Sequence, residues 1–169
     1  WRRVSALGGM VAPFLLAGAV VVTAAARPDY HHSDHMISVL GELGGPRAAV
    51  MNFGGFLLYG VLVFGLAIGL HSGIGNGPGE WLGPLLVAIY GLGYFAVAFA
   101  PCSPGCTGTT PIPSDQAHFL ISRVIFMMAI AGPLVLFARL ARDPAWAGVR
   151  YLVLLLSVGG YLLFLLPIP

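Results

Sequence analysis

The sequence predicts an all-α protein, a polytopic bundle of about five transmembrane helices, and three observations support this prediction. First, 58% of the 169 residues are hydrophobic and only 8% are charged, whereas roughly a quarter of the residues in an average soluble domain are charged. Second, the apolar residues form continuous runs of the roughly 20 residues that a helix needs to cross a bilayer. Third, these runs lack the period-two alternation of barrel strands, and only helices or closed barrels satisfy their backbone groups in lipid.

Five runs meet this length requirement, and each is bounded by charged residues, Pro or Gly. They cover residues 5–26, 53–72, 81–100, 119–138 and 151–168. The first run follows two arginines and ends in three alanines, as in a signal peptide, but it is longer than the apolar core of one. We therefore expect a retained helix and a single transmembrane domain over residues 1–169.

The arginines predict how the helices are oriented. Five of them fall before the first run or between the fourth and fifth runs: Arg2, Arg3, Arg139, Arg142 and Arg150. Four crossings place these five on one side, and the cytoplasmic ends of membrane spans carry an excess of Arg and Lys. We expect a multi-pass protein of the cell (inner) membrane with a cytoplasmic N-terminus, and with residues 27–52 and 101–117 outside.

The first external segment, residues 27–52, concentrates histidines and aspartates. His31 and His35 are four residues apart, and His32 and His35 three apart, so on a helix either pair could bind one metal ion. Asp34 lies between them. A structural or solvated role and a role in acid–base catalysis stay open beside the metal hypothesis.

Apolar residues later in this segment have helical spacing. Met36, Ile37, Leu40 and Leu43 fall on one face, with His35, Val39 and Glu42 on another. This pattern predicts a short amphipathic helix that lies in the membrane interface.

The second external segment, residues 101–117, holds both cysteines. Cys102 and Cys106 flank a Pro-Gly turn on the oxidising side of the membrane, which favours a disulfide. A thiolate metal site and two free thiols are the alternatives.

The fourth apolar run begins with polar residues that repeat every four positions. Ser114, His118 and Ser122 therefore line one face of a helix. Arg123 follows, and an arginine in an apolar run must extend its side chain towards the membrane surface or pair with an acidic group. We predict a polar pocket beneath the two external segments, formed by His32, Asp34, His35, Glu42, His118 and Arg123. The candidate metal ligands are His31, His32, His35 and His118.

The two external segments resemble those of the DUF998 family of bacterial and archaeal membrane proteins. The likeness rests on Asp29-Tyr30, His32, His35, Ile37-Ser38, Leu40-Gly41, Met51-Asn52, Cys102-x-x-Gly105-Cys106 and His118. The sequence departs from the family pattern at His31 and Asp34, where the family tends to have Ser, at Val39, where it has Glu, and at Ser103, where it has Asp. The resemblance implies a sixth helix after Pro169 and no assigned function.

Three functional hypotheses fit the sequence. The first is an accessory or structural subunit that packs against other membrane proteins. It is favoured because the chain has few ionisable side chains that could act in catalysis. The second is an outer-leaflet enzyme or metal-binding protein that uses the external pocket. A transporter fits least, because the spans lack paired acidic residues. We expect membrane lipids as partners, no cofactor, and no nucleic acid, since the net charge is only +2.

Overall fold

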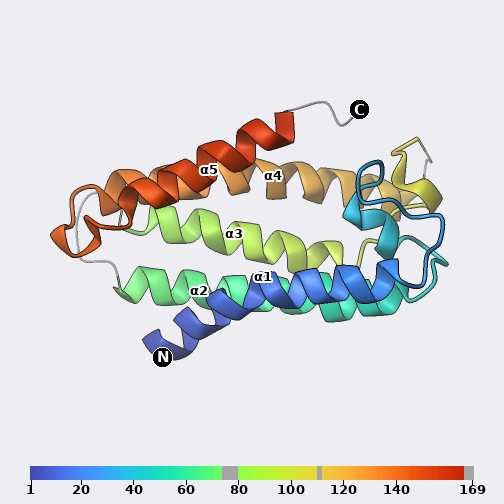
Figure 1. Ribbon diagram of the computed structural model, residues 1–169, viewed down its shortest axis with the longest axis horizontal. Coiled ribbons are helices and arrows are strands. Elements are labelled where there is room, and N and C mark those ends of the chain that lie inside the picture. Colours follow the sequence, from blue (N-terminus) through green and yellow to red (C-terminus); the bar gives the residue numbers. More distant parts are fainter. Residues whose placement is uncertain (74–79, 110–111, 166–169) are drawn as a thin grey trace.

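The computed structural model describes residues 1–73, 80–109 and 112–165, and its regular structure is entirely helical. Over these residues five α-helices follow one another (Figure 1): α1 (Arg2–Ala24), α2 (Leu58–Gly73), α3 (Leu82–Val97), α4 (Pro113–Leu140) and α5 (Arg150–Leu165). A π-helix, η2 (Val50–Leu57), runs directly into α2. The predicted all-α class is confirmed.

Three of the helical stretches are long and apolar enough to cross a membrane, which indicates a multi-pass membrane protein. They are α1, the continuous stretch Val50–Gly73, and α4, while α3 and α5 are shorter apolar helices. The end of the predicted fifth span, residues 166–168, lies outside the described residues.

Helix α4 begins at Pro113, six residues before the start that the apolar run predicts. Pro is favoured in the first turn because its φ angle suits a helix and its missing N–H is not needed there. Asp115 in the same turn is favoured by the partial positive charge of the helix N-terminus. The early start places Ser114, Asp115 and His118 on regular helix.

The helices form a row in chain order, and each one runs antiparallel to the next (Figure 1). Helix α2 packs against α1 and α3, α3 against α4, and α4 against α5. Among the described residues, α1 makes no extensive contact with α4 or α5, so the row is curved and not closed into a ring.

Glycines allow the central helices to approach closely. A Cβ atom added to Gly60 of α2 would lie 2.5 Å from the backbone nitrogen of Phe95, and one added to Gly91 of α3 would lie 2.7 Å from that of Phe64. Small residues at such contacts strengthen helix packing in lipid, where exclusion of water contributes little.

The largest buried cluster lies at the end of the bundle where α1 meets α2 and α3 meets α4. Its members include Leu40, Met51, Phe56, Val97 and Ile125. Three tyrosines extend it towards the bundle centre, with the rings of Tyr59 and Tyr94 4.7 Å apart and the hydroxyl groups of Tyr59 and Tyr90 3.1 Å apart. Tyr90 and Tyr94 therefore pack against this core.

The predicted amphipathic helix is replaced by a single short 3₁₀ turn, η1 (Ile37–Gly41). The four apolar residues also do not share one face, because Met36, Ile37 and Leu43 are exposed whereas Leu40 is buried with Val39 and Glu42. The reason is electrostatic. The Glu42 carboxylate pairs with a buried arginine, so this side of the segment can turn inward.

Candidate functional site

Two segments far apart in the sequence meet at one end of the bundle and form what we call the cap, residues 25–49 and 98–109. The backbone N–H of Leu43 donates to the carbonyl oxygen of Cys102 at 2.9 Å. The Cys102 sulfur lies 3.6 Å from the carbonyl oxygen of Ser38. The cap therefore joins the α1–α2 and α3–α4 connections into one unit.

Arg27 is the central cation of the cap. Its guanidinium donates to Glu42 at 2.8 Å and to both carboxylate oxygens of Asp29 at 2.9 and 3.2 Å. It also donates to the carbonyl oxygen of Val39 at 3.3 Å. Hydrogen bonds to Asp29 and then Glu42 raise the pKa of Arg27, and the bond from Arg27 holds the pKa of Asp29 below its ordinary value of 3.8. Arg27 and Asp29 are therefore both charged at neutral pH.

Glu42 connects the two halves of the cap. One carboxylate oxygen accepts from Arg27, and the other accepts from the backbone N–H of Gly105 at 2.6 Å. Gly105 has φ of 78°, a conformation that residues with a Cβ rarely adopt, and this turn directs its N–H towards Glu42. The side chains of Arg27 and Glu42 are each only 9% exposed. This pair is a buried ion pair and not a surface salt bridge.

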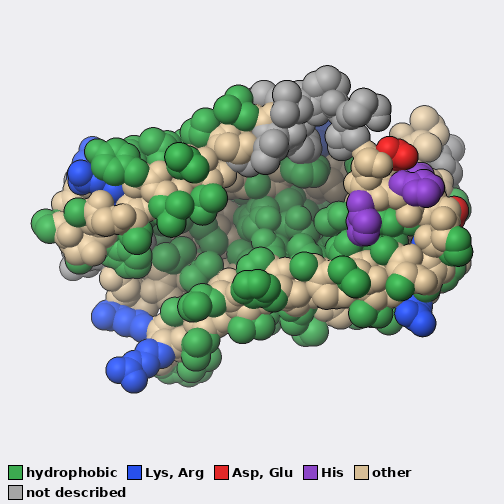
Figure 2. Space-filling model, in the orientation of Figure 1, with side chains coloured by type: hydrophobic (Ala, Val, Ile, Leu, Met, Phe, Trp, Pro, Cys, Tyr) green, Lys and Arg blue, Asp and Glu red, His purple; other side chains and the backbone are tan. Residues whose placement is uncertain are grey.

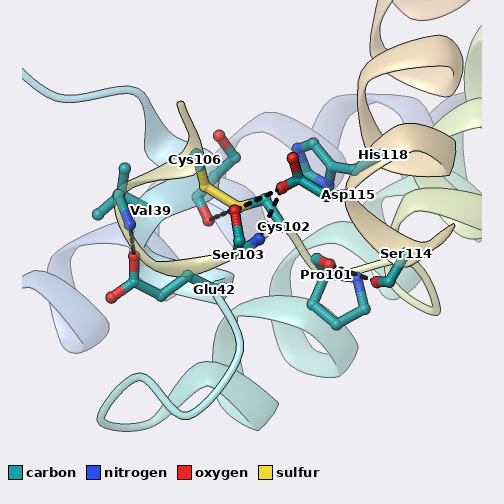
Figure 3. Close-up of a disulfide and its surroundings, with 12 residues drawn as sticks. Val39, Glu42, Pro101, Cys102, Ser103, Cys106, Ser114, Asp115 and His118 are labelled. Atoms are coloured by element: carbon teal, nitrogen blue, oxygen red, sulfur yellow. Dashed lines mark hydrogen bonds between the residues drawn. A yellow bond between two sulfur atoms is a disulfide. The ribbon is translucent and has the colours of Figure 1, made fainter. Parts of the chain in front are cut away.

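The two cysteines close the same turn. Cys102 and Cys106 lie at disulfide distance, with their Cα atoms 5.2 Å apart, and both are buried (Figure 3). The disulfide that the sequence favours is thus the arrangement in the structure.

The start of α4 is bonded to the other side of this turn (Figure 3). One oxygen of the Asp115 carboxylate accepts from the Ser103 backbone N–H at 2.7 Å and from the Ser103 hydroxyl at 2.8 Å. The Ser114 hydroxyl donates to the carbonyl oxygen of Pro101. His118 Nδ1 donates to the carbonyl oxygen of Ala100 at 2.8 Å, so Nδ1 carries the proton. These four bonds fix residues 100–103, which follow α3, to the first turns of α4.

The histidines of the first segment lie on the exposed surface of the cap. His35 Nδ1 accepts from the His31 backbone N–H at 3.1 Å, and the two rings stack with centroids 6.2 Å apart. The His32 ring instead contacts the edge of Tyr30. Over residues 1–73, 80–109 and 112–165, no three His, Cys, Asp or Glu side chains lie close enough together to hold a metal ion.

A cavity of about 380 Å³ lies directly beneath the cap, and we call it the cap cavity. Its polar lining comes from His35 of the cap and from His118, Ser122 and Arg123 of α4. Its other walls are mostly apolar and include Phe56, Val97 and Ile125. In Figure 2 histidine side chains lie at the cap end of a hollowed face that is otherwise lined by hydrophobic side chains.

One comparison with known proteins is informative. Residues 10–168 match the model of the family described as "Protein of unknown function (DUF998)", which is nearly the whole chain. The chain belongs to the DUF998 family. No match was found among curated proteins, and none among solved structures.

In this DUF998 chain the six predicted pocket residues divide into three groups. His35, His118 and Arg123 line the cap cavity together. Glu42 is buried within the cap, bonded to Arg27 and Gly105. His32 and Asp34 are exposed on the cap surface and do not line the cavity.

Two structurally important residues of the DUF998 chain were not predicted as site residues. Arg27 lies at the start of the first external segment, and the aspartate two residues later, Asp29, was the available sign of a local ion pair. Asn52 lies at the start of an apolar run, and its amide donates to the carbonyl oxygen of Gly41 at 2.8 Å. A single amide entering an apolar helix was the available signal, because such a group needs a partner when buried.

Proposed function

We propose that this DUF998 protein crosses the cell (inner) membrane five times, with its N-terminus in the cytoplasm and its cap outside, and acts as an accessory subunit of a membrane protein assembly. The antiparallel row supports this topology. It places the two Arg-rich stretches, at the start of α1 and between α4 and α5, at the end of the bundle opposite the cap (Figures 1 and 2). Fewer arginines lie at the cap end, where Arg47 and Arg123 are exposed. The asymmetry agrees with the positive-inside rule.

Thiol labelling of intact cells tests this orientation. Ser33 is exposed on the cap, and Ala145 lies between α4 and α5. A membrane-impermeant maleimide should label the Ser33→Cys variant and not the Ala145→Cys variant, while the unsubstituted chain serves as the background control. Labelling of Ala145→Cys alone would invert the topology.

The observation that carries the accessory role is that the two buried carboxylates at this end of the bundle are bonded to groups of the chain itself. Glu42 holds Arg27 and Gly105, and Asp115 holds Ser103. In the described residues, no Ser, Thr or Cys side chain is hydrogen-bonded to a histidine, as an activated nucleophile requires. Such bonding suits a rigid closure of the bundle better than a reactive site.

The second hypothesis, an outer-leaflet enzyme or metal-binding protein, rests on the cap cavity. His35, His118 and Arg123 share its walls, and His118 is held firmly by Ala100. An enzyme would need these groups for proton transfer or anion binding. His32 and Asp34, on the outer surface, would contribute to neither.

Single substitutions distinguish the two hypotheses. If the protein is an accessory subunit, the size of its native complex in blue-native gels should not change on substitution of the histidines, except where the protein itself becomes less stable. The variants are His32→Ala, His35→Ala and His118→Ala. His118→Ala alone should lower thermal stability in detergent, because it leaves the buried Ala100 carbonyl oxygen without its donor. Loss of a cellular phenotype in His35→Ala, with stability and complex intact, would favour the enzyme.

A further inference from the structure

A second cavity lies nearer the middle of the bundle. It has a volume of about 320 Å³, and helices α1 to α4 contribute its lining, including Pro13, Tyr59, Tyr90 and Ala129. Tyr90 lines this middle cavity, whereas Tyr94, one helical turn later, lines the cap cavity. The rings of Tyr90 and Tyr94 are 5.2 Å apart, so one ring contact links the linings of the two cavities. We call the mostly apolar side chains that run from the cap cavity past these two rings to the middle cavity the apolar path.

Arg123 is the cation at the cap end of this path. It lines the cap cavity and is exposed, and no hydrogen bond or ion pair joins it to any other described residue. The nearby carboxylates do not pair with it: Asp29 and Glu42 are bonded to Arg27, Asp115 is bonded to Ser103, and Asp34 lies exposed on the cap surface. An arginine in a membrane-spanning helix is costly without an anion or water, so this guanidinium is suited to an anion from outside the chain.

The length of α4 fixes where that anion can come from. Its 28 residues extend over about 42 Å, roughly 12 Å more than the hydrocarbon core of a bilayer. The polar first turns of α4 therefore lie at the level of the lipid headgroups. Arg123 lies ten residues, about 15 Å, from the start of α4 and so below that level, and its side chain reaches the headgroup layer by extending towards the cap.

We propose that the two cavities bind one anionic phospholipid, with its phosphate at Arg123 and one acyl chain along the apolar path. The phosphate supplies the charge that the described residues do not supply to Arg123, and guanidinium groups pair strongly with phosphate. The acyl chain covers apolar walls such as Phe56, Ile125 and Tyr90. Ser122, beside Arg123, supplies a hydroxyl to the same headgroup. This inference depends on the membrane arrangement proposed above but not on the accessory role.

Lipid binding by the purified full-length chain tests the proposal. The chain is delipidated in dodecyl maltoside, and dioleoyl phosphatidylglycerol or dioleoyl phosphatidylcholine is added while native mass spectrometry measures the bound fraction. The unsubstituted chain should bind one phosphatidylglycerol about tenfold or more tightly than phosphatidylcholine, as expected for one charge-assisted phosphate contact. Equal binding of the two lipids would overturn the proposal.

Three variants locate the site. Arg123→Gln should lose the preference for phosphatidylglycerol, whereas Arg123→Lys should keep it. Arg47→Gln is the matched control, because Arg47 is an exposed arginine of the cap whose guanidinium contacts the carbonyl oxygen of Val22. Retained preference in Arg123→Gln, or its loss in Arg47→Gln, would contradict the assignment.

A cavity-filling variant tests the acyl chain separately. Ser122→Phe places a ring in the cap cavity and leaves Arg123 in place, so it should weaken binding of both lipids. Inorganic phosphate at millimolar concentration should not displace phosphatidylglycerol. Undiminished lipid binding by Ser122→Phe, or displacement by phosphate alone, would show a small-anion site on the surface and refute the lipid site. Neither result depends on whether a protein partner exists.

Discussion

Removing the charge of Glu42 should destabilise the whole protein, because this carboxylate holds both halves of the cap. Glu42→Gln keeps the shape of the side chain but weakens the bonds from Arg27 at 2.8 Å and from the Gly105 N–H at 2.6 Å. Loss of one partner from a buried ion pair costs about 3–5 kcal/mol. Arg27 keeps Asp29 as a partner, so we expect a loss of about 2–3 kcal/mol, close to that of one or two charged hydrogen bonds.

The assay is reversible unfolding of the purified chain in mixed detergent micelles, followed by circular dichroism. Asp29→Asn is the matched control, since Asp29 binds the same guanidinium but its side chain is 69% exposed, and we expect little change. A double-mutant cycle with Arg27→Gln should give a coupling energy of about 1–3 kcal/mol. A loss for Glu42→Gln no larger than for Asp29→Asn would refute the view that the pair is buried and structural.

Three further predictions concern neighbouring parts of the cap. Asp115→Asn should lower the unfolding free energy by about 1–3 kcal/mol, since Ser103 loses its charged acceptor, and an unchanged value would contradict the proposed link between α4 and the cap. Gly41→Ala should destabilise by about 1–3 kcal/mol, because a Cβ there would meet the Asn52 side chain, whereas Gly18→Ala, with open space around it, should not. Replacing both Cys102 and Cys106 by Ser should cost about 2 kcal/mol under oxidising conditions and nothing after reduction; equal stability in both conditions would exclude a disulfide.

The helices could be predicted from the sequence because bilayer thickness imposes one length on every apolar run. Their ends were less predictable. Pro113 and Asp115 start α4 early, although hydropathy alone marks the polar first turns as loop. The register of the first external segment was wrong for a related reason: helical spacing of apolar residues ignored that Glu42 has a buried cation as its partner.

The candidate site was predicted in part. His118 and Arg123 share a helix, so their common position follows from spacing, and His35 joins them at the cap cavity. The role of Arg27 could not be predicted from the sequence. Its partner Glu42 is 15 residues away, and local sequence patterns do not determine how the chain folds back over that distance. The link from Glu42 to Gly105 spans 63 residues, and only the packing of the two segments creates it.

Photocrosslinking in native membranes tests the accessory role most directly. Benzoylphenylalanine is placed at exposed positions on the outside of the row, where it reacts with whatever molecule lies against the helices. The positions are Leu7 of α1, Val61 of α2 and Leu155 of α5. Ala12, which lines the middle cavity and is buried, is the inward control. We predict a discrete protein adduct of one size from at least one of the outward positions, and none from Ala12. Lipid adducts alone at every outward position would contradict the accessory role.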